Sequence, residues 1–329
     1  MIYPQFIKSC YSGQEPFRLY FAGAGGVSNY IQHWFDANNV LKLFTQVTDR
    51  KAISNWLSSR RRDNIFLDSG AWAAHSRGEE IDVDDYISYA NSISNRCNAI
   101  AQVDKIPGVY KQPKTREQIL LAPQQSWNNY LYMREHIKEV NKLLPIFHQG
   151  EDFKWLNNML EYKDAKGNHI EYIGISPAND SHINGKIDFM DKVFKIIGSS
   201  SNPNVKTHAF GMTSLYLLER YPFWSADSAG WVKKAAYGLV YIPKPNIVPG
   251  EMSYTLIGFG TRTNSPNHFV NQDAITKKYI REYIEQIGVK FDDLSNKVYE
   301  RSLANCIYLK KWADNYKFTG QSYNKRSLF

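Results

Sequence analysis

Cysteine is scarce in this chain of 329 residues, and its three copies, Cys10, Cys97 and Cys306, are scattered along it. Three separated cysteines give neither a disulfide framework nor a Cys-x-x-Cys metal cluster, so we expect no structural metal ion. This use of cysteine favours an intracellular, reducing compartment, and we expect a cytoplasmic protein.

Long apolar runs are also missing. No stretch approaches the roughly 18 apolar residues that a membrane-crossing helix needs. The first residues, MIYPQFIKSCYSG, have no basic segment followed by an apolar one. Membrane insertion and secretion are therefore not expected.

The composition is that of an ordinary globular protein, with 43% hydrophobic, 22% charged and 14% aromatic residues. This balance predicts a folded chain rather than a disordered one. The 40 Lys and Arg residues exceed the 32 Asp and Glu residues, which gives a net charge of +8. Such a surplus favours an anionic partner, and nucleic acid is one that it allows.

Short apolar runs of strand length alternate with longer segments of helical spacing. We predict eight strands, at residues 18–23, 64–68, 99–104, 144–148, 171–176, 206–210, 223–227 and 239–242. Helix start signals lie between them at Asp82, Thr115, Asp152 and Thr213, and Pro222 ends the last of these helices. Eight strands alternating with helices over about 240 residues predict an α/β fold of the (β/α)8 TIM-barrel type, with a doubly wound sheet as the alternative.

Polar residues stand at or just after the ends of six predicted strands: Asp68, Asp104, Gln149, Ser176, His208 and Asp227. Because a barrel brings the carboxyl ends of its strands to one face, we expect these side chains to converge there. For Ser176 and His208, an ordinary polar strand end is an equally good interpretation.

From residue 265 onward the pattern becomes helical, with helices expected over 270–288 and 292–316. We therefore divide the chain into a barrel domain, 1–264, and a helical extension, 265–329. Residues 271–329 contain 11 Lys or Arg against 7 Asp or Glu. Among them lie the aromatic residues Tyr279, Tyr283, Tyr299, Tyr308, Trp312 and Tyr316. These could track phosphates and stack on bases, but packing of the aromatic rings against the barrel is the interpretation we favour.

Three glycines, Gly23, Gly25 and Gly26, follow the first predicted strand, as they do in a dinucleotide-binding turn. Ser28 stands where that motif requires Gly or Ala, and no acidic residue ends a convincing strand about 20 residues later. We expect no nicotinamide cofactor. The glycines are expected to let the first loop approach a ligand or its neighbours closely.

The sequence DSGAW at 68–72 follows a predicted strand directly and brings a carboxylate, a hydroxyl and an aromatic ring within one turn. DSAGW at 227–231 repeats this composition at the end of the predicted seventh strand. Two carboxylates across a barrel mouth are the equipment for retaining glycosyl transfer, one as nucleophile and one as acid/base. A cap or loop hydrogen bond is the alternative role for either aspartate.

Five motifs together resemble the tRNA-guanine transglycosylase superfamily. They are LDSGAW (67–72), QVDKIPG (102–108), PIFHQGED (145–152), YIGIS (172–176) and HAFGMTSLYLLERYPFWSADSAGW (208–231). The resemblance runs in the same order from about residue 18 to 242. It is strongest to the phage-associated branch of 7-deazaguanine DNA transglycosylases, the DpdA-like proteins.

The resemblance implies a role for each matching residue. Asp68 matches the acid/base, Asp227 the nucleophile, and Asp104 the residue that reads the guanine edge. A carboxylate suits that third role because it accepts hydrogen bonds from both the ring N–H and the exocyclic amine. The base-binding residues implied in this way are Ser69, Trp72 as the stacking ring, Asp104, Gln149, and the backbone of Gly174 and Ile175.

Two departures bear on the substrate. The tRNA-modifying members share a C-terminal zinc site of closely spaced cysteines and a histidine, whereas Cys306 is the one cysteine in that region of this chain. The segment after Asp227 is also shorter than in those members. Both departures favour the DNA-modifying branch, or a relative that acts on another polymer. The resemblance thus implies a pentosyltransferase that replaces guanine in nucleic acid with a free 7-deazaguanine base such as preQ0, without a metal or redox cofactor. If the chain is phage-encoded, it would act in the host cytoplasm.

Two other classes of function remain open from the residues themselves. One is a nucleoside- or glycoside-hydrolysing barrel that uses the same two aspartates with water as the acceptor. The other is a non-catalytic barrel that binds nucleic acid. Protein partners are not predicted by any motif.

Overall fold

The computed structural model describes residues 17–23, 29–58, 65–178, 181–212, 214–245 and 253–316. Its central sheet is parallel and has the strand order β5-β4-β3-β2-β1-β9-β8-β7-β6. The strands are β1 (Arg18–Phe21), β2 (Leu41–Thr45), β3 (Ile65–Asp68), β4 (Cys97–Ala101), β5 (Leu143–Leu144), β6 (Ile146–His148), β7 (Tyr172–Ser176), β8 (Lys206–Ala209) and β9 (Ser225–Ser228).

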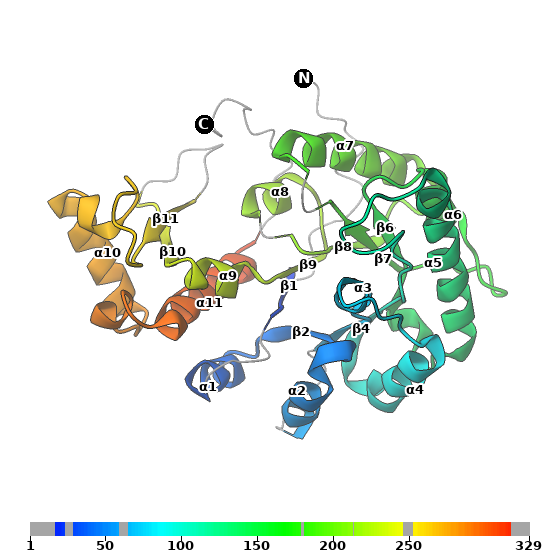
Figure 1. The fold of residues 1–329 in the computed structure, drawn as a ribbon, viewed down its shortest axis with the longest axis horizontal. Coiled ribbons are helices and arrows are strands. Elements are labelled where there is room, and N and C mark those ends of the chain that lie inside the picture. Colours follow the sequence, from blue (N-terminus) through cyan, green and yellow to red (C-terminus); the bar gives the residue numbers. More distant parts are fainter. Residues whose placement is uncertain are drawn as a thin grey trace.

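The sheet closes on itself because β5 and β6 are two parts of one strand. They are separated only by Pro145, which has no N–H to give to the ladder. β5 pairs with β4 and β6 pairs with β7, while the carbonyl of Pro145 accepts a 2.7 Å hydrogen bond from Gly174. The expected (β/α)8 TIM-type barrel is therefore confirmed (Figure 1).

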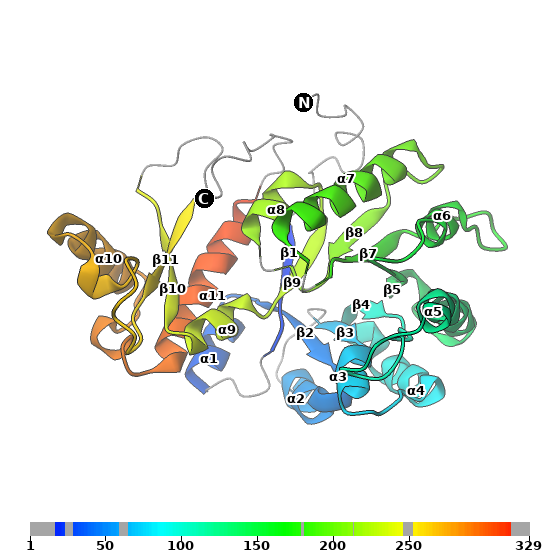
Figure 2. The same ribbon diagram turned by 45° about the horizontal axis from the view of Figure 1, so that its top comes forward.

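Helices cover the outside of the barrel, as Figure 2 shows for α2 and for α4 to α7. The helices are α1 (Asn29–Ala37), α2 (Gln46–Ser58), α3 (Ala71–Ser76), α4 (Val83–Ile93), α5 (Arg116–His136), α6 (Lys154–Glu161), α7 (Ile183–Ser199), α8 (Leu215–Arg220), α9 (Gly230–Ala236), α10 (Ala274–Gln286) and α11 (Val298–Asp314). Short 3-10 turns lie at η2 (Ser94–Arg96), η3 (Val140–Lys142), η4 (Phe269–Asn271) and η5 (Phe291–Asp293).

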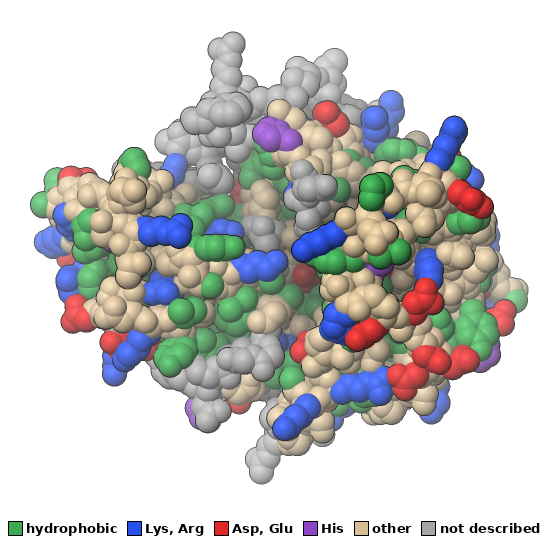
Figure 3. Space-filling model, viewed as in Figure 1, with side chains coloured by type: hydrophobic (Ala, Val, Ile, Leu, Met, Phe, Trp, Pro, Cys, Tyr) green, Lys and Arg blue, Asp and Glu red, His purple; other side chains and the backbone are tan. Residues whose placement is uncertain are grey.

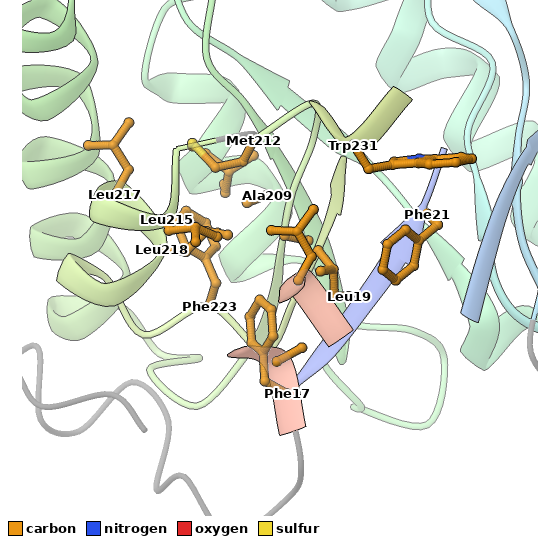
Figure 4. Close-up of a cluster of buried hydrophobic side chains, with 14 of the residues drawn as sticks. Phe17, Leu19, Phe21, Ala209, Met212, Leu215, Leu217, Leu218, Phe223 and Trp231 are labelled. Carbon is orange, nitrogen blue, oxygen red and sulfur yellow. The ribbon is translucent and has the colours of Figure 1, made fainter. Parts of the chain in front are cut away.

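Side chains along each strand point alternately into and out of the barrel, which gives it an inner and an outer apolar layer. In β1, Tyr20 belongs to the inner cluster, whereas Leu19 and Phe21 belong to the outer one. Figure 4 shows the outer cluster around β1, with Phe223 and Trp231 contributed by the segments before and after β9. This double burial holds the strand ends in fixed relative positions.

One predicted strand forms outside the barrel, and one barrel strand was not predicted. Residues 239–242 are not in the barrel: β10 (Leu239–Pro243) pairs antiparallel with β11 (Tyr254–Gly258) in a separate sheet. The missing barrel strand is β2, whose apolar run is interrupted by Lys42. That lysine is nevertheless buried, with its ammonium 5.0 Å from the ring centroid of Phe35 and 5.6 Å from that of Trp231. Asp227 therefore lies on the eighth barrel strand rather than the seventh.

Three of the four predicted helix start signals lie among the described residues, and each stands at the start of a helix. Asp82 caps α4 by accepting a hydrogen bond from the N–H of Asp85, and Thr115 forms a capping box with Gln118 on α5. Asp152 accepts from the N–H of Lys154 at the start of α6. The signal at Thr213 falls outside the described residues, and α8 ends at Arg220, before Pro222.

The helical extension forms as expected, with α10 and α11 inside the predicted ranges. α11 packs against α9, β10 and β1, and most of its residues are buried. Tyr308 stacks on Tyr241 at 5.2 Å between ring centroids, and the indole of Trp312 donates to Glu219. Of the six predicted aromatic residues, Tyr299 alone is exposed. The predicted packing against the barrel therefore holds for Trp312 and Tyr316, which contact Phe17 and α8. Tyr308 and Tyr279 pack instead against β10, outside the barrel. The domain boundary at residue 264 stays a prediction.

Cys97 and Cys306 are buried free thiols. Cys10, Gly25, Gly26 and Ser28 lie outside the described residues, so the glycine-rich turn is seen only at Gly23. In the described part of the chain, no helix combines the length and the apolar character needed to cross a membrane.

Candidate active site

Three carboxylates lie at the carboxyl end of the barrel. Asp68 is the last residue of β3, Asp227 lies near the end of β9, and Asp104 follows β4. β3 and β9 are separated by β1 and β2, with Thr45 in register with Asp68 and Tyr20 in register with Asp227. The predicted convergence of the three aspartates on one face is confirmed.

The pKa of the Asp68 carboxyl group depends on its burial and on its two acidic neighbours. Burial raises its pKa, and the negative charges of Asp227 and Asp104 raise it further, to about 7. Opposing hydrogen bonds come from the hydroxyl of Thr45, at 3.2 Å, and from the N–H of Gly70. A carboxyl group with this pKa can both donate and accept a proton near neutral pH.

The turn after β3 needs glycine. Gly70 has φ +79°, a conformation that L side chains rarely adopt, and a Cβ there would lie 2.4 Å from Cγ2 of Thr45. Ser69 is buried, and its hydroxyl accepts from the N–H of Ala71 at 3.4 Å. This tight turn holds Asp68 and Thr45 together.

Trp72 is presented very differently from the second tryptophan of the repeated motif. Trp72 lies in the first turn of α3 with 58% of its surface exposed, and its ring contacts those of His75 and Tyr110 at 6.1 and 6.0 Å. Trp231, by contrast, is buried and donates from its indole to the carbonyl of Ala22. Only Trp72 of the two offers an open face for stacking.

Asp227 is 7% exposed and is held by the loop after β8. Its Oδ1 accepts a 2.6 Å hydrogen bond from the N–H of Gly211, and Nε2 of His208 lies 3.4 Å from the same oxygen. The other oxygen, Oδ2, makes no hydrogen bond with the residues that the structure describes. One oxygen thus fixes the carboxylate and the other is available to react.

His208 is a fully buried neighbour of Asp227 on β8. Burial lowers its pKa, and this outweighs the opposite effect of Asp227, so the imidazole is neutral. Its Nδ1 lies 2.7 Å from the hydroxyl oxygen of Ser225. His208 therefore supports the carboxylate from inside the barrel, beyond the reach of solvent.

Asp104 carries a hydrogen-bond partner on each oxygen. Nε2 of Gln102 donates to Oδ1 at 2.6 Å, and Nε2 of His148 lies 3.1 Å from Oδ2. Glu151 also accepts from the backbone N–H of His148 at 3.2 Å. Two acidic groups therefore surround His148 at the end of β6.

The other three predicted base-binding residues make hydrogen bonds within the protein, Gln149 to the segment after β7 and Gly174 and Ile175 in the barrel wall. The amide of Gln149 accepts from the N–H of Ala178 and donates to Ser181 and Gly185. The N–H of Gly174 donates to Pro145, and the carbonyl of Ile175 accepts from Phe210. A base-binding role for Gln149, Gly174 and Ile175, and for the buried Ser69, stays a prediction.

A cavity of about 530 Å³ opens beside Asp104, between α3, α4, α5 and the loop before α5. Its lining includes His75, Lys105, Gln118 and Leu121. It does not include Asp68 or Asp227. The space adjoins the proposed base-reading carboxylate and lies to one side of the other two.

Four site residues were not singled out from the sequence. Thr45 lies on the strand that was missed, and Gly211 acts only through its backbone N–H. Gln102 and His148 stand in the motifs QVDKIPG and PIFHQGED, so a polar residue near a strand end was the available signal. Their pairing with Asp104 depends on two neighbouring strands and could not be read from either motif alone.

Comparison with protein-family models gives no match, and comparison with curated proteins gives no significant match. The features that point to a function are therefore the five motifs and the geometry around the three aspartates. Within the described ranges, no three His, Cys, Asp or Glu side chains are placed to share a metal ion.

Proposed function

We propose that this chain is a base-exchanging glycosyltransferase that replaces guanine in nucleic acid with a 7-deazaguanine such as preQ0. The proposed polymer is DNA rather than tRNA. The observation that carries the proposal is the contrast between two carboxylates at one barrel mouth. Asp68 has a pKa near 7, whereas Asp227 is anchored through one oxygen and open at the other.

In the first step, Oδ2 of Asp227 attacks C1′ of the nucleotide. The bond between C1′ and N9 breaks, its electron pair leaves with guanine, and protonated Asp68 supplies the proton. The product is an aspartyl ester of the sugar, which holds C1′ while the bases exchange.

In the second step, the incoming 7-deazaguanine attacks C1′ through its ring nitrogen and gives that nitrogen's proton to the Asp68 carboxylate. The ester bond to Asp227 breaks and the free carboxylate returns. Two inversions leave the configuration at C1′ unchanged. This cycle needs one group that ionises near neutral pH and one that acts as nucleophile, which fits the different environments of Asp68 and Asp227.

Two features support nucleic acid as the polymer. The exposed ring of Trp72, next to Tyr110, resembles the stacking platforms that hold unpaired bases. The net charge of +8 favours a polyanion, and Figure 3 shows basic side chains spread across one face among acidic and hydrophobic ones. A target in duplex DNA would have to leave the base stack to reach Asp227.

The test is incubation of the protein with labelled guanine and either duplex DNA or tRNA. We expect label to enter DNA, with incorporation lost in Asp227→Ala and unchanged in Asp188→Asn, an exposed carboxylate on α7. Release of guanine without incorporation would instead identify a hydrolase. Binding of DNA without either reaction, and unaffected by Asp227→Ala, would identify a non-catalytic barrel.

A further inference from the structure

His148 is an unassigned side chain next to the residue proposed to read the base. It ends β6, and Nε2 lies 3.1 Å from Oδ2 of Asp104. The Asp104 side chain is 11% exposed, and that of His148 is 34% exposed. The imidazole therefore offers the more open edge of the pair to a ligand at the barrel mouth.

The ring of His148 is a cation at neutral pH. Burial lowers its pKa, but the charges of Asp104 and Glu151 and the hydrogen bond to Asp104 together outweigh burial and raise it to about 9. Both ring nitrogens then carry hydrogen. Nε2 is used by Asp104, and Nδ1 makes no hydrogen bond with any residue that the structure describes. One charged donor is left for a ligand.

Two of the base-binding residues implied by the resemblance use their N–H groups within the protein. The amide nitrogen of Gln149 lies 3.1 Å from the hydroxyl of Ser181 and 3.3 Å from the carbonyl of Gly185. The N–H of Gly174 donates to Pro145 at 2.7 Å. Both therefore hold the loop and the strand in place, whereas Nδ1 of His148 has no hydrogen-bond partner among the described residues.

We propose that His148 is a specificity-determining residue that donates from Nδ1 to the 6-oxo oxygen of the bound base. This inference rests on the proposed function. Asp104 accepts from the ring N1–H and the 2-amino group, so the pair presents a donor next to acceptors. That order complements the edge of guanine and of 6-oxo-7-deazaguanines. Adenine is rejected because its 6-amino group would face the Nδ1–H.

The test measures binding of guanine and 6-thioguanine by calorimetry. Both bases keep the donors that Asp104 needs, but sulfur is a much weaker acceptor than oxygen. We expect the parent protein to bind guanine at least tenfold more tightly than 6-thioguanine. His148→Leu is expected to weaken guanine binding by about 10–100-fold and to bring the two affinities within about twofold of each other.

Three further variants separate recognition from folding. His148→Gln keeps a neutral donor and is expected to restore part of the preference for guanine. Gln149→Leu is expected to retain the preference, because its amide serves the loop after β7. Asp104→Asn is expected to weaken binding of both bases and also to reduce the preference for guanine, because Asp104 keeps His148 protonated.

The outcomes distinguish this inference from the proposed function. If His148→Leu or His148→Gln binds guanine with the parent's full preference over 6-thioguanine, or if Gln149→Leu abolishes that preference, the role of His148 is overturned while base binding stands. If the folded parent binds neither base, the proposed function fails and the role of His148 fails with it.

Discussion

The backbone N–H of Gly211 donates a 2.6 Å hydrogen bond to Oδ1 of Asp227. Gly211 has φ +59° in the turn directly after β8, so the loop of one strand fixes the carboxylate of the next. This bond leaves Oδ2 as the oxygen that can react, which gives the proposed nucleophile a single orientation.

A covalent intermediate is the first prediction. Incubation of the protein with DNA in the absence of an incoming base is expected to leave a fraction cross-linked on a denaturing gel. The adduct is expected to vanish in Asp227→Ala, because no ester can form, and to form more slowly in Asp68→Asn. Asp188→Asn serves as the control and is expected to behave like the parent. An adduct mapped by mass spectrometry to Asp68 would reverse the two roles.

The raised pKa of Asp68 predicts a pH-dependent stability difference between the parent protein and Asp68→Asn. The folded carboxyl has a pKa of about 7, above that of an unfolded aspartate, so the folded state binds the proton more tightly. Its stabilising contribution is complete below about pH 4 and is lost as the pH rises through about 7. Across that range the parent is expected to lose on the order of 2–4 kcal/mol relative to the variant.

Urea unfolding from pH 4 to pH 8 measures this difference. Asp188→Asn, which removes an exposed carboxylate, is expected to follow the parent at every pH. A constant difference between Asp68→Asn and the parent across this range would show that the carboxyl of Asp68 ionises normally.

Gly70→Ala is expected to be much more damaging than Gly78→Ala. Both glycines have positive φ, but a Cβ at Gly70 meets Cγ2 of Thr45 at 2.4 Å, whereas one at Gly78 meets nothing within 4 Å. Gly70→Ala is therefore expected to cost about 1–3 kcal/mol more in unfolding free energy, measured by urea denaturation. Equal costs would mean that the turn after β3 has room to move and does not hold Thr45 against Asp68.

The hydrogen bonds of Asn305 predict that the docking of α11 contributes substantially to the free energy of unfolding. It is fully buried on α11, donates to the carbonyls of Trp231 and Leu239, and accepts from the N–H of Tyr241. Asn305→Ala leaves these backbone groups unpaired and is expected to cost about 2–4 kcal/mol in thermal or urea unfolding. Asn315→Ala, at an exposed position near the end of α11, is the matched control. A change below 0.5 kcal/mol (about the limit for surface sites) would show that α11 docks weakly.

The alternation of strands and helices could be predicted from the sequence, because side-chain period and capping are local properties. Asp82 and Thr115 begin helices as predicted, and their side chains accept hydrogen bonds from the N–H groups of Asp85 and Gln118. The same local logic placed Asp68, Asp104 and Asp227 at strand ends, and a barrel then has only one face on which they can meet.

Which strands close the barrel, and what the strand-end residues face, depends on contacts between residues that are distant in the sequence. Lys42 is tolerated in β2 because Phe35 and Trp231, distant in sequence, enclose its side chain. His148 and Gln149 are adjacent in the chain, yet His148 lies against Asp104 while Gln149 binds the loop after β7. The pKa of Asp68 likewise depends on the charges of Asp227 and Asp104, which only folding brings close.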